Sequence, residues 1–244
     1  MHSVARFSAL SAIAGIAALL SPLATAEAAT PDPNSIYIAS VTLGGTGCAA
    51  GTVQTNYVVD TSDPAHPSAT IQFTYDDFVA LLTGPGLDSH GNLLPLTADE
   101  VKARTKNCNV AVTLHIPQGI TVAQIGAQYN GYAQVDDGVT GTQTTQYYFA
   151  DPLGPVHYDT ESSNFPADLD ENGNYQRNDE FIEGALVWTK CGANAIANVN
   201  SRLTLKNAPT ATKAEKAFST GYASLDTQSF GAQQLFRFTW ATCP

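Results

Sequence analysis

The sequence predicts an all-β fold, an antiparallel β-sandwich or jelly-roll-like domain with about ten strands, one short helix and two disulfides. Three observations support this class. From residue 35 onward, apolar and polar residues alternate with a period of two, in short runs that end at Gly, Pro, Asn or Asp. One stretch stands out for a helix-start motif, and four cysteines follow an N-terminal export signal.

The run 109–116 shows the alternation most clearly, because its aliphatic residues at 110, 112, 114 and 116 fall on one face of an extended strand. A Pro-Gln-Gly turn at 117–119 ends the run, and we expect residues 121–129 to form the neighbouring strand. Comparable runs cover residues 36–43, 52–59, 69–75, 143–149, 185–189, 199–206, 218–225 and 234–240.

A short helix is expected at residues 101–104. Thr97 can accept a hydrogen bond from the backbone of Glu100 while the Glu100 side chain reaches back to Thr97, which is the capping-box arrangement. We interpret this helix as an excursion at the surface.

Residues 1–28 have the layout of a secretory signal peptide. Arg6 provides the basic start, an apolar run covers residues 10–20, and small residues allow cleavage after Ala26 or Ala28. A membrane anchor would need about 20 apolar residues, which this run does not reach. We therefore expect residues 29–244 to form a single secreted β domain that has no membrane partner after cleavage.

The four cysteines are Cys48, Cys108, Cys191 and Cys243. In an exported chain they indicate two disulfides, whereas their spacing does not match a zinc site. Three connectivities are open. We favour Cys48 with Cys108 and Cys191 with Cys243, which places one crosslink in each half of the chain.

The charge composition argues against a nucleic-acid partner. The formal net charge is −11 and 14% of the residues are charged. Binding to phosphates needs a basic patch, and the Lys and Arg residues of this chain are few and scattered. We expect the surface to be covered mainly by Thr, Ser, Asn, Gln and Gly.

The chain resembles the secreted proteins grouped as domain of unknown function 4360. The resemblance is carried by an ordered series of short motifs at residues 47–52, 84–86, 104–109, 114–119 and 240–243, together with Gly131-Tyr132-Ala133 and Cys191-Gly192. Ala49 stands where that family usually has Pro, and the stretch 87–103 and the acidic segment near Asp168 are longer than usual. The resemblance implies a small secreted β protein, and it implies no activity or catalytic residues.

An acidic segment resembles a calcium loop of the EF-hand type. Oxygen ligands fall at its first, third and fifth positions, a Gly at the sixth permits a sharp turn, and carboxylates follow near the twelfth. The predicted ligands are Asp168, Asp170, Asn172, Asn174, Asp179 and Glu180. The alternative is a solvated hairpin turn at Asn172-Gly173. No cofactor other than calcium is indicated.

Tyrosines gather in the middle of the chain, where they can either pack in the core or stack against sugar rings on a sheet face. The candidates for binding are Tyr129, Tyr132, Tyr147 and Tyr148.

No catalytic residues can be assigned from the sequence. The acid pairs at 76–77 and 136–137 are adjacent residues, which point to opposite faces of a strand, so neither pair provides the opposed carboxylates of a glycosidase. A nucleophile-elbow motif is absent.

Three functional hypotheses therefore stay open. The first is a non-catalytic surface protein that binds a glycan or a cell-envelope polymer. The second is an extracellular hydrolase whose acids meet only after folding, for example Asp77, Asp136 and Asp226. The third is a structural protein that self-associates through Thr-, Gln- and Asn-rich strand edges.

Overall fold

The computed structural model describes residues 35–60, 62, 67–150, 159–180, 186, 188–225 and 233–243. These residues belong to one compact unit, Pro31–Pro244. The predicted signal peptide of residues 1–28, with cleavage after Ala26 or Ala28, lies outside the described residues and stays a prediction.

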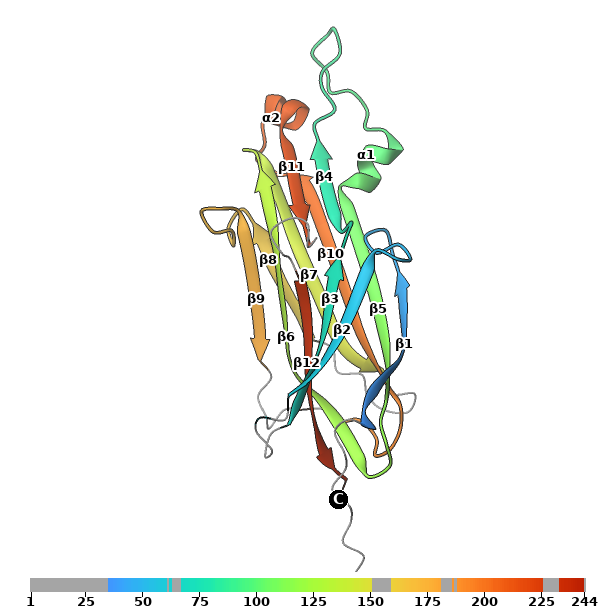
Figure 1. Ribbon diagram of the computed structural model, residues 1–244. Helices are drawn as coiled ribbons and strands as arrows, with labels where there is room; N and C mark the ends of the chain where they lie inside the picture. Colours follow the sequence, from blue (N-terminus) through green and yellow to red (C-terminus); the bar gives the residue numbers. More distant parts are fainter. Residues whose placement is uncertain are drawn as a thin grey trace, which may run out of the picture. The chain divides into compact units, whose positions relative to one another are not determined.

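The domain is an antiparallel β-sandwich, as predicted (Figure 1). Sheet A has the strand order β1 (Tyr37–Gly44), β5 (Thr105–His115), β10 (Ala195–Asn207), β7 (Val139–Ala150) and β8 (Asp159–Phe165). Sheet B has the order β2 (Val53–Asp60), β3 (Ser68–Tyr75), β12 (Gln233–Thr242), β6 (Ile120–Val135), β11 (Thr220–Ser224) and β4 (Val79–Thr83), and β9 (Asn174–Glu180) adds to β6. The described residues thus form twelve strands, where the sequence predicts about ten.

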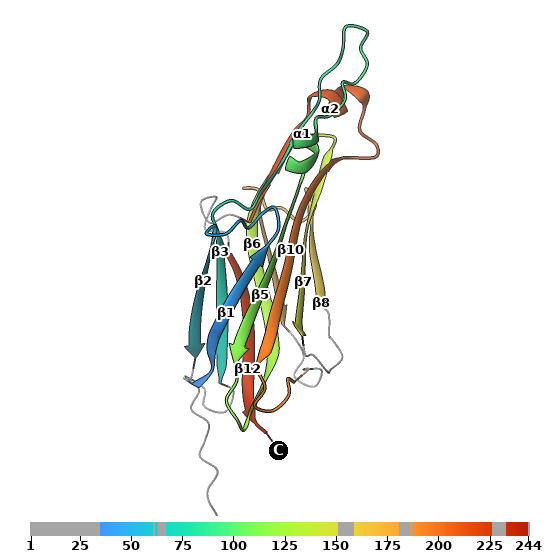
Figure 2. The same ribbon diagram turned by 90° about the vertical axis from the view of Figure 1, so that its right-hand side faces the viewer.

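Two short helices lie at the same end of the domain (Figures 1 and 2). Helix α1 (Ala98–Ala103) has the capping box predicted for Thr97 and Glu100. Helix α2 (Lys213–Phe218) was not predicted, although Thr212 and Glu215 form the same capping box.

The strand after the 117–119 turn does not neighbour the strand before it, so this part of the prediction is wrong. β5 belongs to sheet A and β6 to sheet B. The turn, closed by a hydrogen bond from the Ile120 N–H to the Pro117 carbonyl (3.2 Å), carries the chain from one sheet to the other. Alternation on both sides of a turn does not distinguish a hairpin from such a crossing.

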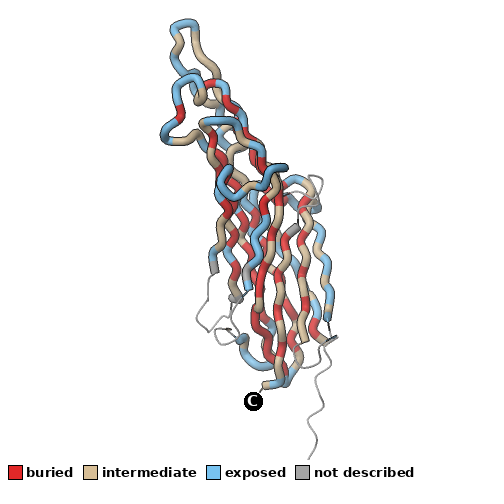
Figure 3. The backbone as a smooth tube through the Cα atoms, turned by 90° about the vertical axis from the view of Figure 1, so that its left-hand side faces the viewer, coloured by how far each residue is buried: buried red, intermediate tan, exposed pale blue. Residues whose placement is uncertain are grey.

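The core lies between the two sheets, where every second residue of strands such as β3 is buried (Figure 3). Aromatic rings from both sheets meet there, for example Tyr147 of β7 and Phe236 of β12, whose centroids are 6.4 Å apart. At about 25 cal/mol per Å² of apolar area removed from water, this burial is the main stabilising contribution.

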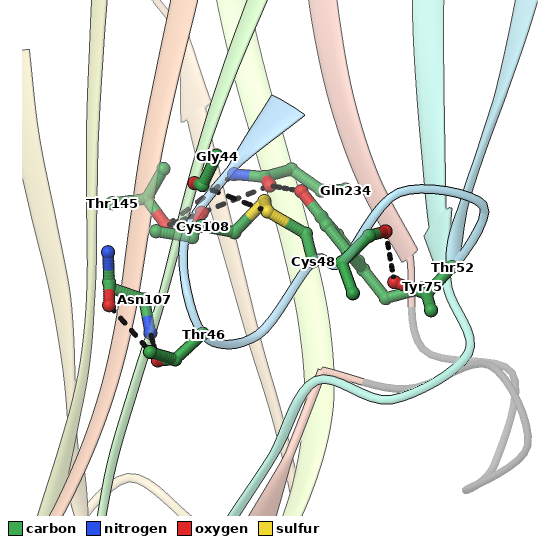
Figure 4. Close-up of a disulfide and its surroundings, with 11 residues drawn as sticks. Gly44, Thr46, Cys48, Thr52, Tyr75, Asn107, Cys108, Thr145 and Gln234 are labelled. Carbon is green, nitrogen blue, oxygen red and sulfur yellow. Dashed lines mark hydrogen bonds between the residues drawn. A yellow bond between two sulfur atoms is a disulfide. The ribbon is translucent and has the colours of Figure 1, made fainter. Parts of the chain in front are cut away.

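A buried hydrogen-bond network joins the sheets through the core (Figure 4). The Gln234 side-chain oxygen accepts from the Tyr75 hydroxyl (2.7 Å) and the Ser201 hydroxyl (3.1 Å). Thr145 and Ser201 lie on neighbouring strands of sheet A with their hydroxyl oxygens 3.2 Å apart. Because polar groups lose hydration on burial, such partners are required for these side chains to be tolerated inside the sandwich.

The disulfides join Cys48 to Cys108 and Cys191 to Cys243, the pairing that the sequence favours. The first ties the loop after β1 to β5 and is buried (Figure 4). The second ties the chain around Cys191 to the end of β12. The crosslinks close loops of 60 and 52 residues, which corresponds to about 4 kcal/mol each on the chain-entropy model.

Replacing Gln234 with Leu tests the buried network. The substitution removes the oxygen that accepts from both Tyr75 and Ser201, so we expect the free energy of unfolding to fall by about 1–3 kcal/mol in chemical denaturation. Gln54→Leu, on the exposed face of β2, is the matched control and should change stability by less than about 0.5 kcal/mol. Equal losses in the two variants would contradict a stabilising role for the network.

Candidate functional site

The outer face of sheet B is rich in amide side chains. One row across five strands consists of Asn56, Gln72, Leu235, Gln128 and Asn178, which the register places side by side. Adjacent rows on this face add Thr70, Thr74, Asn130, Gln176 and Thr239, together with the ion pair of Arg237 and Glu180. Amides both donate and accept hydrogen bonds, so this face suits a ligand that has many hydroxyl groups.

A polar groove of about 740 Å³ lies where β6 and β9 meet the loop between β8 and β9. Its lining is formed by Asn130, Gly131, Ala167, Asp168, Leu169, Asp170, Asn174, Tyr175 and Gln176, and we call this site the polar groove. The strands contribute the amide groups and the loop contributes the carboxylates. The groove is therefore a place where hydroxyl groups can find donors and acceptors together.

Two glycines allow the close contacts around the groove. A Cβ at Gly131 would lie 2.4 Å from the Tyr175 hydroxyl oxygen, which donates to the Ser224 carbonyl (2.9 Å). A Cβ at Gly173, whose φ is +84°, would lie 2.8 Å from Cε2 of Tyr132. Glycine at position 131 leaves room for the Tyr175 side chain to pack over β6. Glycine at position 173 lets the loop backbone pack against the Tyr132 ring.

The loop orders itself through the Asp170 carboxylate. One Asp170 oxygen accepts from the backbone N–H groups of Asn172 and Asn174, both at 2.8 Å, and the other accepts from the Asn174 side-chain amide (3.1 Å). These bonds, led by the backbone N–H of Asn174, lower the pKa of Asp170 below its usual 3.8. Asp168 similarly accepts from the backbone N–H of Asn164 (2.6 Å).

The structure brings part of the predicted calcium set together. Asp168, Asp170 and Asn174 line the groove, whereas Glu180 lies at the far end of β9, six residues or about 20 Å along an extended strand from Asn174. Glu180 instead pairs with Arg237 at 3.6 Å, and the Asp179 side chain lies outside the described part of the structure. Because residues 174–180 form a strand, Glu180 does not close an EF-hand-type shell. Among the described residues, no three His, Cys, Asp or Glu side chains gather as a metal site.

The four candidate tyrosines do not form one surface. Tyr129 and Tyr147 are buried in the core, so we assign them to packing. Tyr132 and Tyr148 are partly exposed, but Tyr132 lies on the outer face of sheet B and Tyr148 on that of sheet A. Tyr132 has a neighbour that the sequence reasoning missed: its ring centroid is 6.0 Å from that of Tyr222 on β11. In the sequence, the one feature that could have indicated Tyr222 is that it lies in a run of alternating apolar and polar residues, which predicts a strand with one face exposed.

The acids of the hydrolase hypothesis are not assembled into a pair. Asp77 lies just before β4, and the carbonyl of the next residue, Phe78, accepts from the Leu225 N–H at one end of β11. Asp136 lies at the opposite end of β11, where its carboxylate accepts from the backbone N–H (2.7 Å) and the hydroxyl (2.8 Å) of Thr220. Five strand residues separate these ends by about 17 Å, more than the about 5–10 Å that glycosidases use. The bonds from Thr220 lower the pKa of Asp136, and Asp226 lies outside the described residues.

A second pocket contains another side chain that the sequence reasoning missed. Trp188 lines a recess of about 330 Å³ beside the Cys191–Cys243 disulfide. In the sequence, the one feature that could have indicated Trp188 as a candidate is that the chain has two tryptophans.

Comparison with known proteins decides the family. Residues 34–243 match the family described as Domain of unknown function (DUF4360). The chain belongs to this family. An uncharacterized secreted protein of Arthroderma benhamiae is 32% identical to this DUF4360 protein over 213 residues, which cover 87% of this chain and 74% of that protein.

This DUF4360 protein is secreted. Its relative is a secreted protein, and its two disulfides suit an oxidising compartment. In the described part of the chain, no helix has the length and apolar character needed to cross a bilayer.

Solved structures resemble the domain only distantly. The structure of TmCBM61 in complex with beta-1,4-galactotriose is 9% identical, with 84% of this chain and 90% of that chain covered and a TM-score of 0.25. A carbohydrate-binding module of the β-sandwich superfamily is 8% identical, with 75% of this chain and 54% of that chain covered and a TM-score of 0.26. Scores this low do not bear on the function of the DUF4360 protein.

The ordering of the groove loop by Asp170 predicts a pH dependence. Because the folded-state pKa is lowered, the stabilisation is present above the usual value of 3.8 and is lost as the pH falls through the folded-state pKa. We expect Asp170→Ala to lower the melting temperature at pH 7 and the difference from the natural protein to shrink at the most acidic pH tested. Asp170→Asn, which keeps an acceptor but does not titrate, is the control. Parallel melting curves for Asp170→Ala and the natural protein at every pH would contradict this role.

Calcium binding by the remaining loop oxygens stays a prediction. If Asp168, Asp170 and the neighbouring amides hold calcium, the ion should raise the melting temperature of the purified protein and EGTA should reverse the rise, because a ligand stabilises the state that binds it. An unchanged midpoint, with no calcium found in the preparation, would remove this site.

Proposed function

We propose that this DUF4360 protein is a secreted, non-catalytic glycan-binding protein, and that it holds a neutral polysaccharide in the polar groove. The observation that carries the proposal is the lining of the groove. Asn130, Asn174 and Gln176 offer amides, and Asp168 and Asp170 offer carboxylates. A sugar presents hydroxyl groups that both donate and accept, and such a mixture of groups can satisfy them.

The aromatic pair at the end of the groove supports the same ligand class. Tyr132 is opposite Asn174 in the β6–β9 register, and its ring lies near that of Tyr222. A tyrosine ring offers an apolar face and a polar tip, which matches the apolar and hydroxyl-bearing faces of a sugar. The low proportion of charged residues in the chain favours a neutral ligand over a polyanion.

The two other hypotheses predict different properties. A hydrolase needs a pair of acids about 5–10 Å apart, and Asp77 and Asp136 are too widely separated to be that pair. Self-association would use an exposed sheet edge such as β1, whose residues are mostly exposed and which pairs with β5. Neither property explains why polar groups gather in the groove.

Pull-down of the secreted protein on a panel of insoluble polysaccharides and cell walls tests the proposal. We expect one or more neutral polysaccharides to retain the natural protein. Gln176→Ala and Tyr132→Ala should each weaken retention by about tenfold, because Gln176 lines the groove and the Tyr132 ring lies beside it, opposite Asn174. Tyr148→Ala, which removes a partly exposed tyrosine from the opposite sheet, is the matched control and should bind normally.

Two measurements on the same samples separate the alternatives. Release of soluble sugar products would indicate a hydrolase, and a mass that rises with protein concentration in the absence of sugar would indicate self-association. Retention that is unaffected by both groove variants would contradict the groove as the binding site.

A further inference from the structure

Trp188 is a large apolar side chain that the fold leaves at the surface. Its exposed fraction is 42%, whereas that of Trp240 is 7%. A partly exposed indole offers an apolar face to a ligand, and the surroundings of Trp188 decide what that ligand can be.

The backbone around Trp188 is fixed against the edge of β6. Trp188 forms a bridge with Ala123, and the Thr189 N–H donates to the Val122 carbonyl (2.9 Å). The Thr121 hydroxyl donates to the Thr189 carbonyl (2.6 Å). Two residues further on, the Cys191–Cys243 disulfide ties this segment to the end of β12. The indole is therefore presented by a rigid support, which reduces the entropy lost when a ligand binds.

The recess beside the indole has the chemistry of a sugar-ring site. Its volume is about 330 Å³, and Ala241 and the disulfide form apolar walls. Thr121, Thr189 and Thr242 complete the lining, in which the Thr121 hydroxyl donates to the Thr189 carbonyl and the Thr189 hydroxyl accepts from the Val122 N–H. Within the described residues the lining carries no charged side chain. An aromatic face with hydroxyl groups around it suits a neutral pyranose ring, whose apolar C–H face can lie on the indole.

The recess lies on the same face of sheet B as the polar groove. Ala123 is opposite Thr239 on the outer face, and Gln128 lies on that face together with Asn130 and Gln176, which line the groove. A register shift near residues 124–126 makes this so, because strict alternation would put residues 123 and 128 on opposite faces. From Ala123 to Tyr132, β6 advances 132 − 123 = 9 residues, or about 30 Å, past the amide rows described above.

We propose that Trp188 and the threonines around it form a second sugar-binding subsite, which takes a neutral pyranose ring stacked on the indole. A single extended polysaccharide then lies along β6, with one part at Trp188 and another in the polar groove. The inference rests on the proposed function for its ligand class. The Trp188 recess itself is built from different residues and can be tested separately.

The two tryptophans provide a direct probe. In protein labelled with 15N at the indole nitrogens, the chain should show two indole N–H resonances, which Trp188→Phe assigns. Titration with soluble neutral oligosaccharides of glucose, N-acetylglucosamine, mannose and galactose should move the Trp188 resonance in a saturable way and leave that of Trp240 nearly in place. Trp188→Ala should weaken binding of the longer oligosaccharides by about tenfold or more.

Phe218→Ala is the matched control, since Phe218 is an aromatic residue with 64% exposure at the end of α2, outside this face. It should bind as the natural protein does. Thermal melting of each variant checks that the domain is folded, and the resonance of Trp188 in the unmutated protein reports on the subsite without any substitution.

The outcomes separate the two proposals. If an oligosaccharide binds and Gln176→Ala weakens its binding while the Trp188 resonance stays still, the subsite is wrong and the groove stands. If the Trp188 resonance moves and neither Gln176→Ala nor Tyr132→Ala has an effect, the subsite stands and the groove is wrong. A Trp188 resonance that moves with protein concentration alone would assign this surface to self-association and overturn the subsite. Absence of binding to every oligosaccharide and polysaccharide would overturn both.

Discussion

The pairing of β6 with three other strands is the interaction on which the rest of this structure depends. β6 runs for 16 residues, with β12 and then β11 along one edge and β9 along the other. Its inner face places Val122 and Tyr129 in the core, and its outer face carries Tyr132. A slip of one residue would exchange these faces, so the register that buries the core also positions the candidate binding surface.

The protein handles polar side chains in two different ways. Inside the sandwich, Gln234 bonds to Tyr75 and Ser201, which compensates for the loss of hydration. On the outer face of sheet B, the amides of Gln128 and Asn178 are opposite each other in the register and face outward. The same residue types thus stabilise the junction of the sheets in one place and form a surface suited to hydroxyl-rich ligands in another. The negative net charge and the small share of charged residues are the reason that we propose a neutral polymer, and not a polyanion, as the ligand of this surface.

The sequence predicted well those features that depend on neighbouring residues. The alternation at 109–116 appears in β5, and the motif at Thr97 begins α1 as expected. It did not predict β4, β8 or β9. The sequences of β8 and β9, DTESSNF and NYQRNDE, carry little apolar alternation. These strands lie at the edge of the sandwich, where fewer inward-facing side chains need to be apolar and where pairing with β7 and β6 supplies their stabilisation. For the candidate site, the sequence pointed to the acidic loop and to Tyr132. It missed Tyr222 and Trp188, because their positions depend on strands that are distant in the chain.

The sequence by itself determined the all-β class, the disulfide-bonded and secreted character, and the family, because alternation, cysteine content and ordered motifs are local properties of the chain. Only the tertiary structure decided that the 117–119 turn crosses between sheets, that Glu180 lies far from the acidic loop, and that Trp188 and Tyr132 share one face. The physical reason is that a period of two specifies which side chains along a strand lie together. It does not specify which strand lies alongside, and one register shift in β6 is enough to change which residues share a face.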